Sequence, residues 1–217
     1  METIEITVPV NDLHLKASLC IPPLAESLII FSHGSGSSRF SPRNRKVAEY
    51  FNRENIATLL VDLLTVEEDR EVENRFNIHL LSERLVEVTA YVRELKELRG
   101  LPIGYFGAST GAASALQAAA RFGNKIQAVV SRGGRPDLAK NPEHVTAPVL
   151  LIVGSLDTEV IQLNKLAAAH LRCEHELKIV EGASHLFEEP GKMEIVSELA
   201  LSWFRNHLKP NPELHVI

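Results

Sequence analysis

The sequence contains few cysteines, few aromatic residues and no long apolar run. Only Cys20 and Cys173 occur among 217 residues, without metal-ligand spacing, so neither a disulfide framework nor a cysteine-based zinc site is expected. No apolar run approaches the roughly 20 residues that cross a bilayer, so we expect no membrane association. The first residues contain neither the basic region nor the apolar region of a secretory signal peptide. Secretion is therefore not indicated, and a cytoplasmic location is expected.

An excess of positive charge is also absent. Lys and Arg number 23 against 28 Asp and Glu, a net charge of −5. Binding to nucleic acid needs a concentrated basic face, so nucleic acid is not an expected partner. A content of 45% hydrophobic and 24% charged residues is typical of a globular chain. The length suits one α/β domain, and we expect residues 1–217 to form it. The oligomeric state does not follow from these numbers.

The hydrophobic pattern predicts a mostly parallel sheet covered by helices. Residues 3–8 and 13–17 alternate in polarity around Asn11-Asp12, which predicts an antiparallel hairpin. Later apolar runs are short and nearly continuous, as in strands buried on both faces. They lie at 28–31, 57–61, 103–106, 128–130, 149–153 and, more weakly, 177–180.

Helical periodicity fills the segments between these runs. Apolar side chains recur at helical spacing over 81–95, and helices are also predicted at 110–122, 159–171 and 192–207. Strands that alternate with helices predict an α/β fold with helices on both faces of the sheet. In such a sheet the functional residues follow the carboxyl ends of the strands.

A candidate nucleophile lies at one of these strand ends. Gly107-Ala108-Ser109-Thr110-Gly111 follows a predicted strand and opens an alanine-rich helix, which is the context that a G-x-S-x-G motif requires. A serine on so sharp a turn needs small neighbours two residues away on each side, and the two glycines meet that need. The helix N-terminus places free N–H groups beside a developing oxyanion. We predict that Ser109 is the nucleophile and not part of an ordinary tight turn.

A carboxylate and a histidine follow in the chain order Ser, Asp or Glu, His. Asp157 comes just after a predicted strand, where capping of the next helix is the alternative role. Glu159 and Asp137 are rival carboxylates. Among nine histidines, His185 combines a strand-end loop with the correct order. We predict that His185 is the general base and acid, and that Asp157 orients its ring.

The loop at 31–38 is the candidate oxyanion loop, because it carries an HG motif after a predicted strand. We predict that the backbone N–H groups of Thr110 and Ser35 form the oxyanion hole, and that His33 supports the loop. A phosphate-binding glycine loop is the alternative. Arg39 stands where its third glycine would be, and the Gly-Lys-Ser/Thr ending is missing, so nucleotide binding is disfavoured.

Three arginines are candidates for substrate binding. Arg132 and Arg135 follow a predicted strand, and Arg39 follows the oxyanion loop. Because guanidinium groups match carboxylates and phosphates, they suggest an anionic group on the substrate. The alternative is that they pair with the acidic stretch 67–73, which could itself rim the pocket but is typical of a solvated surface.

The order of these motifs resembles the dienelactone hydrolase-like branch of the α/β-hydrolases, over nearly the whole chain. The resemblance rests on the hairpin, His33-Gly34-Ser35-Gly36, Asp62-Leu63-Leu64-Thr65, Gly107-x-Ser109-x-Gly111, Gly154-Ser155-x-Asp157 and Ser184-His185-Leu186-Phe187-Glu188. It implies an eight-stranded, mainly parallel sheet, a Ser/Cys–His–Asp triad, and no metal or organic cofactor. Dienelactone hydrolases carry a cysteine nucleophile where this chain has Ser109, so the lactone substrate is not carried over.

Together these features predict a serine hydrolase. It would cleave a small or medium carboxylic ester, lactone or thioester through an acyl-enzyme, and the chain is too short to include a separate lid domain. Two alternatives stay open: an acyltransferase or amidase that uses the same triad, and a catalytically silent ligand-binding protein on the same scaffold. The physiological substrate does not follow from the sequence.

Overall fold

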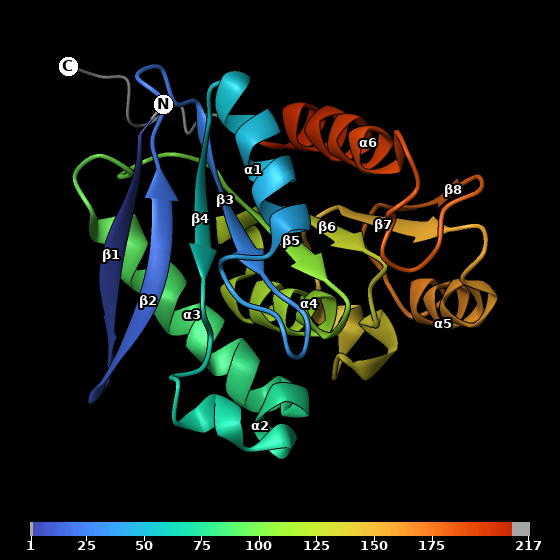
Figure 1. Cartoon of the computed structure of the whole chain (residues 1–217), viewed down its shortest axis with the longest axis horizontal. Helices are drawn as coiled ribbons and strands as arrows, with labels where there is room; N and C mark the ends of the chain where they lie inside the picture. The colour runs from blue at the N-terminus through green and yellow to red at the C-terminus, as the bar shows by residue number, and fades with distance from the viewer. Residues whose placement is uncertain (1, 210–217) are drawn as a thin grey trace.

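The chain forms an eight-stranded sheet with helices on both faces in a computed structural model that describes residues 2–209 (Figure 1). The strand order is β1-β2-β4-β3-β5-β6-β7-β8; β2 is antiparallel to both of its neighbours, and all other pairs are parallel. The strands are β1 (Thr3–Val10), β2 (Leu13–Cys20), β3 (Ser27–Ser32), β4 (Ile56–Val61), β5 (Ile103–Ala108), β6 (Ile126–Arg132), β7 (Val149–Gly154) and β8 (His175–Val180). The helices are α1 (Pro42–Arg53), α2 (Val72–Phe76), α3 (Ile78–Glu94), α4 (Thr110–Phe122), α5 (Thr158–Ala168) and α6 (Lys192–His207).

The predicted hairpin, parallel strands and four helices are confirmed, but helix α1 was not anticipated from the pattern. Its signal is local: Ser41 caps the helix by accepting a hydrogen bond from the Asn44 N–H at 3.4 Å, and Pro42 occupies the first position. Val47 and Phe51 are buried against the sheet. Among the residues that the structure describes, no helix is both long enough and apolar enough to cross a membrane.

Two apolar layers hold the sheet between its helices. Helices α3 and α4 pack on one face, and α1 and α6 on the other (Figure 1). On the second face an aromatic cluster joins the layers: the ring centroids of Phe31 and Phe106 lie 5.0 Å apart, and those of Phe51 and Phe204 lie 5.7 Å apart. The sheet is therefore a rigid platform, and its parallel strands carry the loops at their carboxyl ends to one edge.

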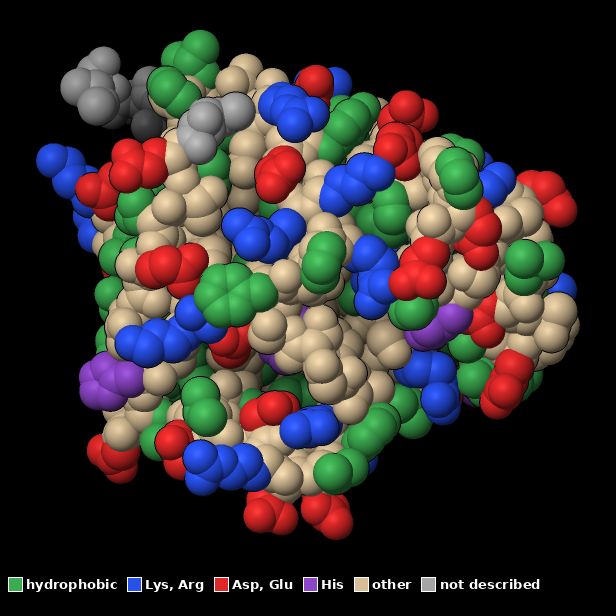
Figure 2. All heavy atoms as spheres, viewed as in Figure 1, with side chains coloured by type: hydrophobic (Ala, Val, Ile, Leu, Met, Phe, Trp, Pro, Cys, Tyr) green, Lys and Arg blue, Asp and Glu red, His purple; other side chains and the backbone are tan. Residues whose placement is uncertain are grey.

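Two carboxylates of the acidic stretch between β4 and α3 pair with nearby arginines. Glu68 pairs with Arg84 at 2.9 Å, and Asp69 pairs with Arg75 at 3.1 Å. Figure 2 shows side chains of both signs intermixed over the face viewed in Figure 1. This stretch therefore folds back on its own helices, and the candidate arginines at the ends of β3 and β6 do not pair with it.

The contact between β5 and α6 predicts a stability effect at Gly104. A methyl group there would lie 2.7 Å from Cε1 of Phe204 and 3.0 Å from Cδ1 of Ile29. We expect Gly104→Ala to lower the free energy of unfolding by about 1–3 kcal/mol, because overpacking displaces well-packed side chains. Urea denaturation measures the change. In the Phe204→Leu background the same substitution should be less destabilising, and strictly additive effects would contradict the assigned contact.

Candidate active site

Ser109 lies on the strained turn between β5 and α4. Its backbone has φ 51° and ψ −124°, values that a residue with a side chain rarely adopts. Close packing around it requires glycines. A methyl group at Gly107 would lie 2.5 Å from Cα of Ala112, and one at Gly111 would lie 2.1 Å from the Ser32 carbonyl oxygen. The turn can therefore form only because these two positions lack side chains.

The turn after β6 connects Ser109 to His185. The N–H of Ser109 donates to the Arg132 carbonyl at 3.3 Å, and the N–H of Arg135 donates to the Ser109 carbonyl at 3.0 Å. Within the same turn Gly133 has φ 51°, and a methyl group there would lie 3.6 Å from Cε1 of His185. Backbone contacts thus bring the candidate nucleophile and the candidate base to one point on the sheet edge.

Asp157 and His185 form a direct pair. Oδ2 of Asp157 lies 2.6 Å from Nδ1 of His185. Asp157 occupies the N-cap position of α5, yet its side chain makes no capping hydrogen bond and faces the imidazole instead. A carboxylate only accepts hydrogen bonds, so Nδ1 carries a proton and Nε2 of the neutral ring is left as an acceptor. This tautomer is the one that a general base requires.

The hydroxyl of Ser109 and the ring of His185 do not hydrogen-bond to each other in this structure. Side chains of this kind are often loosely aligned before substrate binds. The Asp157 side chain is 14% exposed and that of His185 is 39% exposed. A mostly covered carboxylate thus supports an imidazole that is partly open to solvent.

The loops that carry Asp157 and His185 are bonded to each other through their backbones. The N–H of Leu156 donates to the Ala183 carbonyl at 3.0 Å, and the N–H of Gly182 donates to Oγ of Ser155 at 2.8 Å. A methyl group at Gly154 would lie 2.2 Å from the same Ala183 carbonyl oxygen. Gly154 and Ser155 could be recognised in the sequence motif. Only the structure shows that their contacts with the 182–183 backbone hold Asp157 beside His185.

The turn after β3 lies against Ser109. Gly34 is so close that a methyl group there would lie 2.9 Å from Cβ of Ser109. The N–H of Ser35 donates to Oγ1 of Thr110 at 2.9 Å, and His33 hydrogen-bonds through Nδ1 to the Gly34 carbonyl at 3.0 Å. Thr110 begins α4, so its own N–H has no partner within the helix. The two predicted oxyanion donors therefore lie side by side, with the Thr110 hydroxyl on one of them.

A cleft of about 170 Å³ opens beside this turn. Leu64 and Val66 give it an apolar wall, and Val66 is 72% exposed. The residues that line the cleft are His33, Ser37, Ser38, Asp62, Leu64, Thr65, Val66 and Asp69. A much larger hollow, about 850 Å³, lies at the other edge of the sheet. None of the predicted site residues lines either hollow, but the smaller cleft adjoins the turn that carries Ser35.

Two of the three candidate arginines are bound to carboxylates of the chain itself. Arg39 contacts Glu5 through Nε at 2.9 Å and also pairs with Asp62. Arg135 forms two 2.9 Å hydrogen bonds with Asp137. The same bonds engage Asp137, one of the rival carboxylates. Glu159, the other rival, is exposed on α5.

Arg132 differs from the other two because it is buried and forms no ion pair with a carboxylate in the described part of the chain, residues 2–209. It is 5% exposed. Among residues 2–209 its Nε has no hydrogen-bond partner, and its Nη2 donates a hydrogen bond to Oδ1 of Asn44 at 3.4 Å. The guanidinium carbon lies 5.9 Å from the centroid of the Phe187 ring, which covers it. Burial, and secondarily the nearby Arg43, lowers the pKa of Arg132 to about 10.

Comparison with known proteins identifies the family that shares this fold. No family profile matches the chain. A crystal structure of dienelactone hydrolase from Anabaena variabilis superimposes with a TM-score of 0.93 and 48% identity, over 96% of this chain and 99% of that one. The chain belongs to the dienelactone hydrolase family of α/β-hydrolases. Est1E from Butyrivibrio proteoclasticus, 18% identical, shares the fold with a TM-score of 0.78 over 93% of this chain and 98% of its own.

A relative in Mycobacterium tuberculosis is about twice as long. It is 49% identical over 205 residues, which are 94% of this chain and 46% of the relative. The relative carries the provisional name of a phosphoribosyl transferase. The chain thus spans about half of the curated relatives that it matches. Within residues 2–209, no group of three or more His, Cys, Asp or Glu side chains is arranged to hold a metal ion.

The contact between Gly34 and Ser109 predicts a local effect in this dienelactone hydrolase family member. Gly34→Ala should slow labelling of the chain by a fluorophosphonate, a reagent for activated serines, at least about tenfold, since the new methyl displaces the serine or the oxyanion turn. Intact mass against time measures the rate. Gly36→Ala is the control, because no atom lies within 4 Å of its added methyl, although its φ of 68° adds backbone strain. Labelling of Gly34→Ala at the wild-type rate would contradict the assigned geometry.

Proposed function

We propose that the chain is a serine hydrolase that cleaves a carboxylic ester through an acyl-enzyme. The observation that carries the proposal is the 2.6 Å contact between Asp157 and His185, made by a carboxylate that leaves its helix-capping role. It is supported by the strained Ser109 at the N-terminus of α4 and by a family of hydrolases.

The steps follow from the roles of the three side chains. Nε2 of His185 accepts the hydroxyl proton of Ser109 as Oγ attacks the carbonyl carbon of the ester. The resulting imidazolium donates that proton to the leaving alcohol as the C–O bond breaks, which leaves an acyl group on Ser109. Water then repeats the sequence, with His185 again as base and then acid, and releases the carboxylic acid. Asp157 stabilises the imidazolium throughout.

The oxyanion that forms in both steps would be bound by backbone N–H groups. The N–H of Thr110 lies at the helix N-terminus, where the dipole favours negative charge. The N–H of Ser35 is occupied by the Thr110 hydroxyl, so the substrate oxygen would replace that hydroxyl on the amide. Rotation of one side chain then completes the site.

The size of the cleft favours a small or medium acyl group. At about 170 Å³, with Leu64 and Val66 as its apolar wall, it would accept a short aliphatic chain or a single ring. A long fatty acyl chain would extend past Val66 into solvent. The two free cysteines, Cys20 and Cys173, are compatible with the cytoplasmic location expected from the sequence.

Phosphoribosyl transfer is not the activity that we propose for this chain. The mycobacterial relative that bears that name extends well beyond the matching region. The arrangement of Ser109, His185 and Asp157 supports acyl transfer, so phosphoribosyl transfer is not carried over to this chain.

The proposed nucleophile can be tested by covalent labelling. We expect one fluorophosphonate adduct per wild-type chain and none on Ser109→Ala or His185→Ala. With p-nitrophenyl esters of increasing acyl length, turnover should fall steeply beyond short chains, and each substitution should lower turnover by up to about 10⁶-fold.

Thermal denaturation of all three proteins confirms that they are folded. A folded wild-type chain that forms no adduct would contradict the proposal and favour the ligand-binding alternative. An adduct that survives in Ser109→Ala would place the nucleophile elsewhere. Comparison of hydrolysis with transfer to added alcohol separates a hydrolase from an acyltransferase.

We also propose that Arg132 binds an anionic group of the substrate. A buried guanidinium without a carboxylate opposes folding, here by on the order of 3 kcal/mol given its lowered pKa. A carboxylate or phosphate of the substrate would supply the missing partner next to Ser109, whose N–H bonds to the Arg132 carbonyl. Because Phe187 covers the guanidinium, its ring must move aside for binding.

Replacement of Arg132 separates stability from substrate recognition. At pH 7 it is charged in both the folded and the unfolded chain, so its penalty is fully present below about pH 10 and declines above it. We expect Arg132→Met to raise the free energy of unfolding by about 1–3 kcal/mol at pH 7 and to lower kcat/KM for an ester bearing a carboxylate at least about tenfold. A neutral ester of the same length should be unaffected. Equal losses on both esters would contradict the anion role.

A further inference from the structure

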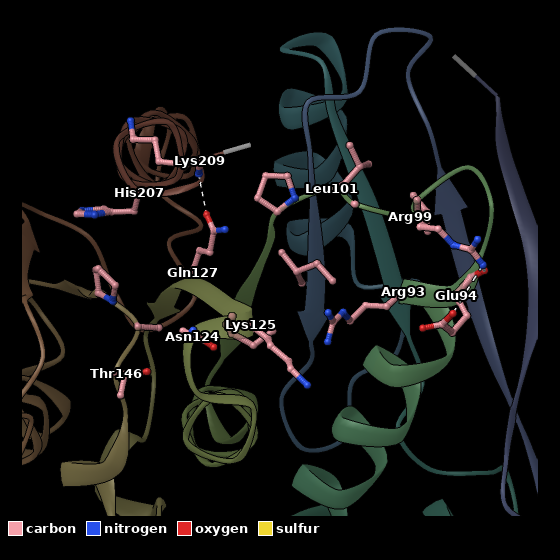
Figure 3. A pocket seen from close by; sticks show the side chains of 17 residues that line it. Arg93, Glu94, Arg99, Leu101, Asn124, Lys125, Gln127, Thr146, His207 and Lys209 are labelled. Carbon is pink, nitrogen blue, oxygen red and sulfur yellow. Dashed lines mark hydrogen bonds and ion pairs between the residues drawn. The ribbon is translucent and has the colours of Figure 1, made fainter. Parts of the chain in front are cut away.

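A large hollow lies at the amino ends of β5 and β6, opposite the edge that carries Ser109. Its volume is about 850 Å³ (Figure 3). Its floor is apolar and includes Ile103 and Ile126, which are both buried. Its walls are formed by the end of α3, the residues just after α4, and the end of α6 with Lys209. Concave sites of this size, with apolar floors and a few polar groups, are typical of small-molecule binding.

Two cations face this hollow without a carboxylate. Arg93 comes from the last turn of α3 and Lys125 from the short turn after α4, and their side chains extend toward the same space in Figure 3. Among residues 2–209 neither has an acidic partner within 4.0 Å, whereas the neighbouring Arg99 pairs with Glu94 at 3.7 Å. Since the chain has a net charge of −5, this gathering of cations is local.

Polar groups suited to a hydroxylated ligand surround the cations. The side chains of Asn124 and Thr146 line the hollow. Gln127 is already engaged, because its Oε1 accepts a hydrogen bond from the N–H of Lys209 at 2.7 Å. The wall therefore combines charge for an anion with an amide and a hydroxyl for a sugar-like group.

We propose that this hollow binds a phosphorylated small molecule, with Arg93 and Lys125 as its phosphate ligands. The planar fork of an arginine and the compact charge of a lysine are the two side chains that recognise phosphate groups. The apolar floor would hold the uncharged part of the ligand. The site is independent of the triad, since the two lie at opposite edges of the sheet.

The competing explanation is that both cations only offset the negative ends of two helices. Basic residues in a last helical turn are favourable for this reason alone. Arg53 in the last turn of α1 and Lys165 in the last turn of α5 have that role, carry the same charges and lie outside the hollow. They supply a matched control.

The experiment measures binding of inorganic pyrophosphate and of ribose 5-phosphate to the whole chain by isothermal titration calorimetry. We expect one site per wild-type chain and a Kd at least about tenfold weaker in Arg93→Gln/Lys125→Gln. The Arg53→Gln/Lys165→Gln control should keep its Kd within about twofold. Fluorophosphonate labelling of Ser109 should proceed at the wild-type rate in both variants, which shows that they are folded.

Three results would overturn the site. No binding of either probe at millimolar concentration would mean that the two cations serve the helix ends only. Equal weakening in both double variants would mean that the probes respond to overall charge. Unchanged affinity in Arg93→Gln/Lys125→Gln would place the bound phosphate elsewhere.

Discussion

The backbone of Ser109 is held in a conformation that costs energy, and most of the active site is arranged by the contacts that maintain it. A φ of 51° at a residue with a side chain persists only where the surroundings leave no alternative. Here Gly107 and Gly111 allow the neighbouring backbone to approach closely. The turn after β6 hydrogen-bonds to both the N–H and the carbonyl of Ser109. Because Gly133 in that turn lies next to His185, one constraint positions Ser109 and His185 together.

Arg132 shows how such a site can oppose the stability of the chain that contains it. Its guanidinium is buried beside Phe187 without a carboxylate, while Arg39 and Arg135 at the same sheet edge are paired. A methionine would fill the same space without a charge to desolvate. A residue that destabilises the fold at the point where chemistry is expected is most simply understood as part of that chemistry, and this reasoning underlies its proposed role.

The two edges of the sheet differ in their electrostatics. At the carboxyl edge the N-terminus of α4 favours the negative charge that develops on a substrate. At the amino edge the helices present their C-terminal ends, and Arg93 and Lys125 lie there. The partial negative charge of these helix ends repels an anion. An anion can therefore bind at that edge only where the attraction of side-chain cations is stronger than this repulsion. The same topology therefore separates the proposed acyl-transfer site from the cationic hollow.

Local patterns were sufficient for much of this molecule. The alternation around Asn11, the apolar strands, the G-x-S-x-G turn and the order Ser109, Asp157, His185 could all be recognised in the sequence, because each depends on residues close in the chain or on their order. Helix α1 was missed although Ser41 and Pro42 signal its start. Tertiary structure alone decided three other features: the partners of the arginines, the hydrogen bond between the Ser35 amide and the Thr110 hydroxyl, and the hollow at the amino edge. They depend on side chains that meet across the fold from distant segments, and no spacing along the chain records which of them will meet.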